Sequence, residues 1–447
     1  MAKENNVELK GTLGVVDGWA IGTGAMVGVT IFTVSGTISG LAGPAACLGF
    51  VVAAAIVFCV ALCYCEIASL FPGAGGAYVF PKKVIKGELG HFLSFLSGWS
   101  LWGGQGLGPV VVTITTVNYL NTLLGLLGIG FKFPITVTTI VLALLYFLVN
   151  AGGKSGGRAV QLISTFAVVA ILVLYIIWGG VNMKPELLTP FMPNGAASII
   201  PCAAACILSF SGWSTIPNMS EEFKNPERDV PRASLLCLAT CALIFALFVY
   251  VMNGLLPGSV LAGEATPPVA AMNTFTTVGA YIITIGSLFA CSSTSNGLLM
   301  TCSRIPFAMG RSGDLPKGIG KVNAKGICLN ALILTTVGHI AIALTGSMVY
   351  TLVSLSVCAT IVSWVLTVIS SLIVRYGKKV KTPFHAFGYP VVPIIAIAGL
   401  IFMFTRLAKN GIIMTIVWDA LGIIIFFLFQ KTGLKKMCNE YVPEEVI

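Results

Sequence analysis

Charged residues are scarce in this sequence. Asp, Glu, Lys and Arg make up 9% of the 447 residues, while hydrophobic residues make up 56%. Soluble proteins contain about 25% charged residues. A chain with so few charges cannot give water-exposed domains a polar surface, which excludes a soluble protein and predicts an integral membrane protein.

Histidine is also scarce, with three residues in the chain. His91 and His385 lie in predicted loops, and His339 lies in an apolar stretch. This number is too small for a His-based metal site. Because Asp and His are nearly absent from the apolar stretches, no Ser-His-Asp set can be assembled there. We therefore expect no enzyme, no metal site and no cofactor.

Long apolar stretches account for most of what is present. A membrane-spanning helix needs about 20 predominantly apolar residues, and the sequence supplies twelve such stretches separated by short polar turns. It therefore predicts an all-α integral membrane protein with twelve transmembrane helices in one polytopic domain over residues 1–447. The predicted spans are 13–39, 44–70, 92–124, 133–150, 160–181, 199–219, 234–256, 277–302, 329–344, 348–374, 391–407 and 412–429.

The distribution of basic residues tests this count, because Lys and Arg accumulate on cytoplasmic loops. With the amino terminus inside, twelve spans place 22 of the 26 Lys and Arg residues on the cytoplasmic side. Adding or removing one span would destroy this segregation. We therefore predict a multi-pass protein of the plasma or inner membrane with both termini cytoplasmic. The formal charge of +10 then reflects topology, and no nucleic-acid partner is expected.

The first and sixth spans contain residues that weaken a helix near its middle. Residues 22–30 include Gly22, Gly24 and Gly28, and residues 208–217 include Gly212 and Pro217. Unwound backbone in a bilayer is tolerated only where it is buried in protein or lines a cavity. Interrupted helices at matching positions of two halves are the best sequence indication of a transporter's binding site.

Two such breaks would suit a zwitterionic ligand. A half-helix that begins near Val29 presents free N–H groups and a partial positive charge of about +0.5, which can hold a carboxylate. Free carbonyl groups near Met26, Leu208 and Ser211 can accept hydrogen bonds from an ammonium group. The alternative is that the glycines only let neighbouring helices approach closely.

Four motifs in order along the chain resemble the amino acid-polyamine-organocation superfamily of permeases. They are GTGAMVGVTIF at 22–32, YCEI at 64–67 followed by FPGAGGAY at 71–78, EEFKNPERDVPRA at 221–233, and SR, AM and GDLP between 303 and 316.

This resemblance implies a leucine-transporter-like fold with a 5+5 inverted repeat. Helices 1–5 would occupy about 13–181 and helices 6–10 about 199–374, with two extra helices at about 391–429. It also implies that the carboxylate-binding amides fall near Val29 and Thr30, and that Phe210 occupies the aromatic gate region beside Trp213. The implied substrate-binding residues are Gly24, Met26, Gly28, Val29, Thr30, Leu208, Phe210, Ser211, Gly212, Trp213 and Ser214.

The chain departs from the family pattern at two positions. Thr30 stands where many members have Gly, and Val168 stands where a subset of members carries a Lys whose charge replaces a sodium ion.

Ser214 stands where arginine-selective relatives carry an acid, so neutral amino acids are favoured over cationic ones.

Other polar residues in the spans offer further candidates. Ser292, Ser293 and Thr294 can face carbonyl groups of helix one and suit Na⁺, although hydrogen bonding between helices is the simpler interpretation. Gln105 can line the pocket or bond a neighbouring helix. The acids Asp17, Glu66 and Asp419 are candidates for coupling, because ionisable groups inside membranes are often functional, but all three lie near predicted span ends.

The loop 221–232 alternates acidic and basic residues. It is either a solvated turn or a cytoplasmic latch that pairs with basic residues around Arg304 and Arg311. Pairs that face water contribute only about 0–1 kcal/mol each. This energy is small enough for the pairs to break when a gate opens.

Together these features predict a secondary active transporter, a symporter or an exchanger, which moves small neutral amino acids by alternating access. H⁺ or Na⁺ would be the coupling ion and the protein would be a monomer. The alternatives are a polyamine, amine or cationic amino acid transporter, and a sensor that binds an amino acid without moving it.

Overall fold

The computed structural model describes residues 11–32, 34–71, 75–107, 110–152, 157–323, 326–346, 349–378 and 380–431. Within these residues the chain forms helices and no strand, apart from an isolated parallel bridge between Leu13 and Phe223. The all-helical prediction is confirmed. Both termini, to which the topology prediction assigned the cytoplasmic side, and residues 72–74 of the FPGAGGAY motif lie outside the described residues.

The longer helices of the first half overlap the predicted spans, and several short elements lie between the spans. They are α1 (Val15–Thr30), α2 (Ser35–Ala42), η1 (Gly43–Ala45), α3 (Ala46–Leu70), η2 (Gly76–Tyr78), α4 (Phe80–Val84), α5 (Gly87–Leu101), η3 (Trp102–Leu107), α6 (Val110–Leu126), α7 (Ile135–Ala151), α8 (Gly157–Val181), η4 (Pro185–Leu188) and η5 (Ala196–Ser198).

In the second half the longer helices again overlap the predicted spans, while α12, α13 and α15 lie between the spans. They are α9 (Ile199–Cys206), η6 (Ile207–Ser214), α10 (Thr215–Asn218), η7 (Ser220–Glu222), α11 (Pro226–Leu255), α12 (Gly258–Leu261), α13 (Pro267–Asn273), α14 (Thr277–Cys302), α15 (Arg304–Arg311), α16 (Leu329–Leu344), α17 (Val349–Leu372), η8 (Ile373–Gly377), α18 (Val391–Phe404) and α19 (Lys409–Lys431).

Hydropathy and length make much of this structure compatible with a bilayer. In the part of the chain that the structure describes, eight helical stretches are long and apolar enough to cross a membrane. Three shorter apolar helices, α7, α16 and α18, fall on further predicted spans. The remaining predicted span begins with α1, a helix of 16 residues.

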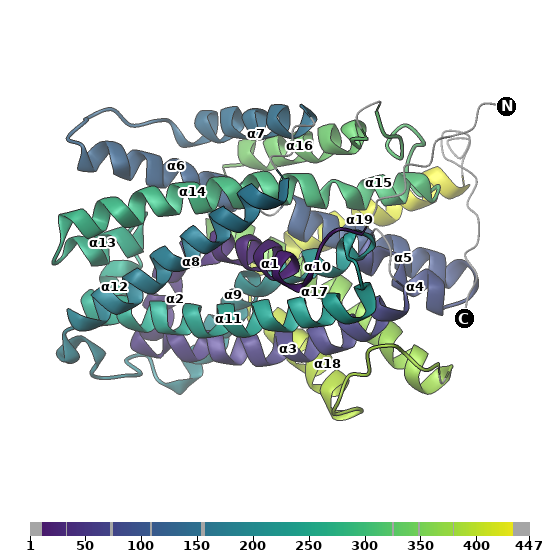
Figure 1. The fold of residues 1–447 in the computed structure, drawn as a ribbon, viewed down its shortest axis with the longest axis horizontal. Helices are drawn as coiled ribbons and strands as arrows, with labels where there is room; N and C mark the ends of the chain where they lie inside the picture. Colours follow the sequence, from purple (N-terminus) through teal and green to yellow (C-terminus); the bar gives the residue numbers. More distant parts are fainter. Residues whose placement is uncertain are drawn as a thin grey trace.

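The helices are packed around α1. Figure 1 shows α3, α11 and α14 running along the longest axis of the molecule, with α1 near the centre of the view and α7, α16 and α18 at the periphery. α12 and α13 lie at the left end, and α4 and α15 lie at the right end. α1 packs against α8, α11, α14 and η6. The two spans expected to be interrupted are therefore in contact inside the bundle.

Candidate functional site

Helix one is interrupted later than the sequence predicted. α1 is an α-helix from Val15 to Thr30, and α2 begins at Ser35. The expectation that a second half-helix starts near Val29 is therefore wrong, because α1 continues through Thr30 and the next helix starts at Ser35. The structure does not describe the side chains of Val29 and Thr30.

Close packing explains why the glycines of α1 do not break the helix. A Cβ atom on Gly22 would lie 2.7 Å from Ile216 Cδ1 and 2.9 Å from Cys237 Sγ. A Cβ atom on Gly28 would overlap the side chain of Thr294. The contacts that the missing side chains permit outweigh the low helix propensity of glycine, about 1 kcal/mol per residue. For Gly22 and Gly28 the close-approach alternative is the one observed.

Helix six changes its winding over the predicted segment without a gap. η6 is a 3₁₀ helix of eight residues between α9 and α10, and all eight residues are buried. Runs of 3₁₀ helix longer than three or four residues are uncommon, and in the middle of a helix they often mark a hinge or strain. The interruption expected at 208–217 is therefore a tightening of the helix.

Hydroxyl groups within helix six bind its own carbonyl oxygens. Ser211 Oγ donates to the Leu208 carbonyl at 2.8 Å, and Ser214 Oγ donates to the Ser211 carbonyl at 2.9 Å. Thr215 Oγ1 donates to the Gly212 carbonyl at 2.7 Å. Two of the carbonyls predicted to receive an ammonium group, those of Leu208 and Ser211, thus accept side-chain hydrogen bonds here.

The two unusual segments touch at Gly212. A Cβ atom on Gly212 would lie 2.7 Å from both the Ala25 carbonyl carbon and the Met26 amide nitrogen. Only a residue without a side chain allows the two backbones to come this close. The structure therefore brings together Met26 and Gly212, which the sequence had placed in one site.

The aromatic residues of η6 point to different neighbours. Phe210 is buried, with ring centroids 6.2 Å from Phe50 and 5.8 Å from Phe245. Trp213 packs against Tyr64 at 5.1 Å and against Trp364 at 5.8 Å. The buried indole N–H of Trp213 has no hydrogen-bond partner in the described part of the chain. Buried polar groups are normally paired, so this donor is available to a ligand or a water molecule.

Gln105 connects helix three to helix six. Its Nε2 donates to the Ser211 carbonyl at 3.2 Å and to Ser214 Oγ at 2.8 Å, and Ser214 Oγ is 3.1 Å from Gln105 Oε1. Gln105 lies in η3, a π-helical turn that joins α5 to α6. Such turns are rare and are frequent at functional sites. Of the two alternatives raised for Gln105, the bond to a neighbouring helix is observed, and lining of a substrate pocket stays a prediction.

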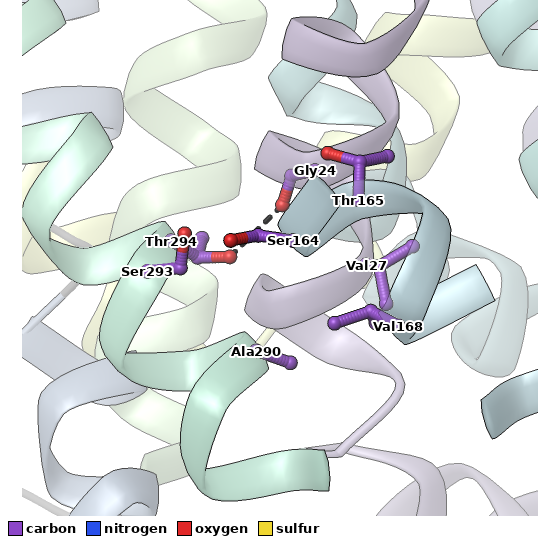
Figure 2. A pocket seen from close by; sticks show the side chains of 8 residues that line it. All are labelled: Gly24, Val27, Ser164, Thr165, Val168, Ala290, Ser293 and Thr294. Atoms are coloured by element: carbon purple, nitrogen blue, oxygen red, sulfur yellow. Dashed lines mark hydrogen bonds between the residues drawn. The ribbon is translucent and has the colours of Figure 1, made fainter. Parts of the chain in front are cut away.

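A small cavity lies between α1, α8 and α14. It is lined by Gly24, Val27, Ser164, Thr165, Val168, Ala290, Ser293 and Thr294. Figure 2 shows these residues and the hydrogen bond from Thr294 Oγ1 to the Gly24 carbonyl, which measures 2.9 Å. The volume of about 10 Å³ has room for roughly one water-sized particle.

Some of the residues predicted for the site lie at this cavity. Gly24, Ser293 and Thr294 line it, whereas Ser292 does not. Thr294 makes the interhelical bond that was the simpler interpretation of the hydroxyls. Sequence reasoning missed Ser164 and Thr165, although two adjacent hydroxyl residues inside an apolar span were a usable signal.

Polar contacts hold the end of helix six that follows α10. Glu222 forms an ion pair with Arg304 at the start of α15. The Thr12 and Leu13 amides donate to the Glu222 carbonyl at 2.8 and 2.9 Å, and the Lys224 amide donates to the Leu13 carbonyl at 2.9 Å. The pairing predicted for the 221–232 loop with Arg304 is confirmed, while its role as a gate stays a prediction.

The three membrane-proximal acids are engaged by protein groups. Asp17 accepts a hydrogen bond from the Gly14 amide at 2.8 Å. Glu66 pairs with Arg375 at 3.2 Å. Asp419 accepts from Ser100 Oγ at 2.8 Å. Protein groups thus satisfy each of these acids near the predicted span ends, and nothing in these contacts requires a coupling role.

Arg375 also stacks 4.0 Å from the ring of Tyr389 in the loop before α18. Burial raises the pKa of the Tyr389 phenol above its usual value, so this ring is neutral beside the ion pair. The cluster thus fixes the end of α3 to the loop between η8 and α18.

Comparison with known proteins agrees with this architecture. The sequence profile of a family described as amino acid permease matches residues 13–429. The chain is 28% identical over 457 residues to the branched-chain amino acid permease BcaP of Bacillus subtilis, covering 97% of this chain and 96% of that protein. It is 28% identical to the methylthioribose transporter of Bacillus subtilis, covering 96% and 95%. It is 27% identical to BcaP of Lactococcus lactis, covering 93% and 94%.

Proposed function

This chain belongs to the amino acid permease family, and from that premise we propose that it is a secondary active transporter of small neutral amino acids. It is a multi-pass membrane permease and not an enzyme. Alternating access would move the substrate past a site between helix one and helix six. Symport and exchange are both compatible with this mechanism.

We infer the leucine-transporter-like arrangement of twelve spans from the positions of the irregular segments. The interruption between α1 and α2 and the 3₁₀ segment η6 fall in the first and sixth predicted spans. The sixth span comes five positions after the first, and an odd offset reverses orientation in the membrane. This spacing supports an inverted repeat of two five-helix units followed by α18 and α19.

The contact of Gly212 with Ala25 and Met26 is the observation that carries the proposed site. It places the 3₁₀ segment of helix six against helix one in the interior of the bundle. Backbone amide and carbonyl groups of these segments would bind the carboxylate and ammonium groups of an amino acid. The BcaP proteins, which carry branched-chain amino acid permease in their names, agree with an uncharged substrate side chain.

The residues around the site argue against a cationic substrate or a polyamine. Residues 208–217 contain no acid, and the polar partners at this position are the neutral Gln105 and Ser214. A second positive charge would therefore be buried without a partner, which is costly. The flux measurement below distinguishes a transporter from a sensor that binds an amino acid without transporting it.

The test is uptake by the full chain reconstituted in liposomes. Labelled L-amino acids are screened, and leucine, isoleucine, valine and alanine are expected to enter, whereas arginine and putrescine are not. Methylthioribose is included because a relative that matches over 95% of its length is named a methylthioribose transporter. Binding without flux would favour the sensor, and failure of every amino acid in folded protein would refute the proposal.

We further propose that Na⁺ occupies the cavity shown in Figure 2 and is the coupling ion. The Gly24 carbonyl and the hydroxyls of Ser164, Ser293 and Thr294 offer hard oxygen ligands on three helices. Val168 lines the same cavity, so no lysine charge competes with a cation there. The cavity has the size of a single ion, which supports this assignment.

Uptake under an inward Na⁺ gradient, under a proton gradient and with internal amino acid alone separates the coupling modes. We expect Na⁺ to stimulate uptake in the unmodified protein. Ser293→Ala is expected to raise the Na⁺ concentration needed for half-maximal uptake, whereas Ser292→Ala, next to it but outside the cavity, is not. Stimulation by the proton gradient alone would assign the coupling to H⁺ and refute the Na⁺ site.

We also propose a monomer in the plasma or inner membrane with cytoplasmic termini. The segregation of basic residues supports this orientation. Single cysteines that replace Lys86 and Lys132 should be labelled from opposite sides of sealed vesicles. Labelling of both positions from the same side would contradict the twelve-span topology.

A further inference from the structure

The Ser211 carbonyl in η6 accepts two hydrogen bonds in this structure. Gln105 Nε2 donates at 3.2 Å, and Ser214 Oγ donates at 2.9 Å. A carbonyl oxygen has two lone pairs, and in a 3₁₀ helix such as η6 a backbone N–H three residues on also approaches them, so this oxygen has no free acceptor position. All three residues are buried, and Gln105 is 3% exposed.

The backbone that carries Gln105 is anchored away from helix six. Side chains of two other helices bind carbonyl groups of the π-helical turn η3. Cys302 Sγ lies 3.1 Å from the Gln105 carbonyl, and Ser356 Oγ donates to the Gly104 carbonyl. A Cβ atom on Gly104 would lie 2.8 Å from the Ser356 carbonyl. η3 is therefore fixed to α14 and α17, and within the described residues its side-chain hydrogen bonds to η6 come from Gln105.

A substrate ammonium group at this carbonyl has to displace a donor. The ammonium of an amino acid forms charge-assisted hydrogen bonds, which are roughly twice as strong as neutral ones. Exchange of the neutral Gln105 amide for an ammonium group is therefore favourable. In the absence of substrate, the amide returns as the second side-chain donor to this buried carbonyl, beside Ser214 Oγ.

We propose that Gln105 is a placeholder for the substrate ammonium group, which occupies the Ser211 carbonyl in the empty transporter and leaves it when an amino acid binds. This inference rests on the proposed function, because it requires an amino acid between helices one and six. Gln105 is then a positioning residue that acts through the Ser211 carbonyl. It stabilises the empty form, which must reorient during net uptake but not during exchange of one amino acid for another.

The experiment compares net uptake with exchange in the reconstituted full chain carrying Gln105→Leu, which keeps the volume and removes the amide. Without the competing donor, substrate binding should become tighter by about five-fold, the value of one hydrogen bond. Net uptake into empty liposomes should fall several-fold relative to exchange, since the empty carrier has lost its placeholder. Ser214→Ala removes the other donor to the same carbonyl and should lower the same ratio, so the inference can be tested if one variant fails to fold.

Thr113→Val is the matched control. Thr113 is a buried residue of α6, and its hydroxyl bonds to Ser295 and His339 rather than to helix six. This variant loses comparable hydrogen bonds and should keep the ratio of net uptake to exchange. Weaker substrate binding by Gln105→Leu with an unchanged ratio would overturn the inference and leave the transport function intact. Absence of any amino acid flux in the unmodified protein would instead refute the proposed function.

Discussion

Helix one and helix six accommodate their glycine-containing segments in different ways. Helix one stays α-helical from Val15 to Thr30 and is then interrupted before Ser35. Helix six keeps helical winding throughout but tightens over Ile207–Ser214, where hydroxyls and the Gln105 amide bind its carbonyls. A glycine-containing segment in a membrane helix can thus be stabilised either by close packing of neighbouring helices or by side-chain hydrogen bonds. The variants below test each solution.

The largest effect is expected at Gly212, where helix six meets the backbone of helix one. A methyl group in Gly212→Ala would lie 2.7 Å from backbone atoms of Ala25 and Met26, and backbone atoms cannot rotate away. We expect a destabilisation of about 3 kcal/mol, the upper part of the range for overpacking, and loss of substrate binding. Thermal unfolding in detergent and ligand binding measure both.

Gly297→Ala in α14 is the control for this substitution, because a Cβ atom there meets nothing within 4 Å. It should leave stability and binding close to those of the unmodified protein. Wild-type affinity in Gly212→Ala would show that the two backbones are not in contact.

A smaller effect is expected at Gly28, where helix one meets a side chain. The added methyl group of Gly28→Ala would overlap Thr294 and lie 2.9 Å from the Ala290 carbonyl. Since Thr294 can rotate, we expect a cost of about 1–2 kcal/mol. Its rotation would break the bond to the Gly24 carbonyl, so the response to Na⁺ should weaken more than substrate binding. Equal loss of both in uptake assays would contradict this assignment.

Removal of the Thr294 hydroxyl tests the hydrogen bond to helix one on its own. Thr294→Val keeps the shape of the side chain and deletes the 2.9 Å bond to the Gly24 carbonyl. We expect a loss of about 1 kcal/mol in the free energy of unfolding, measured by thermal unfolding without Na⁺. A variant as stable as the parent would mean that the bond adds nothing to the contact of α1 with α14.

The smallest effect is expected at the Glu222–Arg304 ion pair, which lies beyond helix six. Both side chains are partly exposed, and exposed pairs contribute about 0–1 kcal/mol. Glu222→Gln should therefore change stability by less than about 1 kcal/mol, and the change should shrink as salt is added. Glu227→Gln, an exposed residue of the same region, serves as the control. An effect of equal size in 1 M salt would rule out a screened pair.

Much of the helical layout could be predicted from sequence because apolar runs end abruptly at polar turns. The spans predicted at 277–302 and 329–344 coincide with α14 and α16. The position of the interruption after α1 could not be predicted, because the effect of Gly22 and Gly28 on the helix depends on which side chains pack against them. The site was anticipated in part. Gly212 and Met26 do meet, but the link from Gln105 to Ser211 depends on a π-helical turn that has no recognisable sequence pattern.

The bonds that join residues 12–13 to residues 222–224 set an order for biosynthesis. Translation proceeds at about 5–20 residues per second, so the first of these segments leaves the ribosome on the order of ten seconds or more before the second. During that interval the Thr12 and Leu13 amides and the Leu13 carbonyl lack the partners that Glu222 and Lys224 later supply. The entrance to the first helix thus reaches its final form only after the sixth has been made, and a nascent chain that stops short of residue 222 cannot complete it.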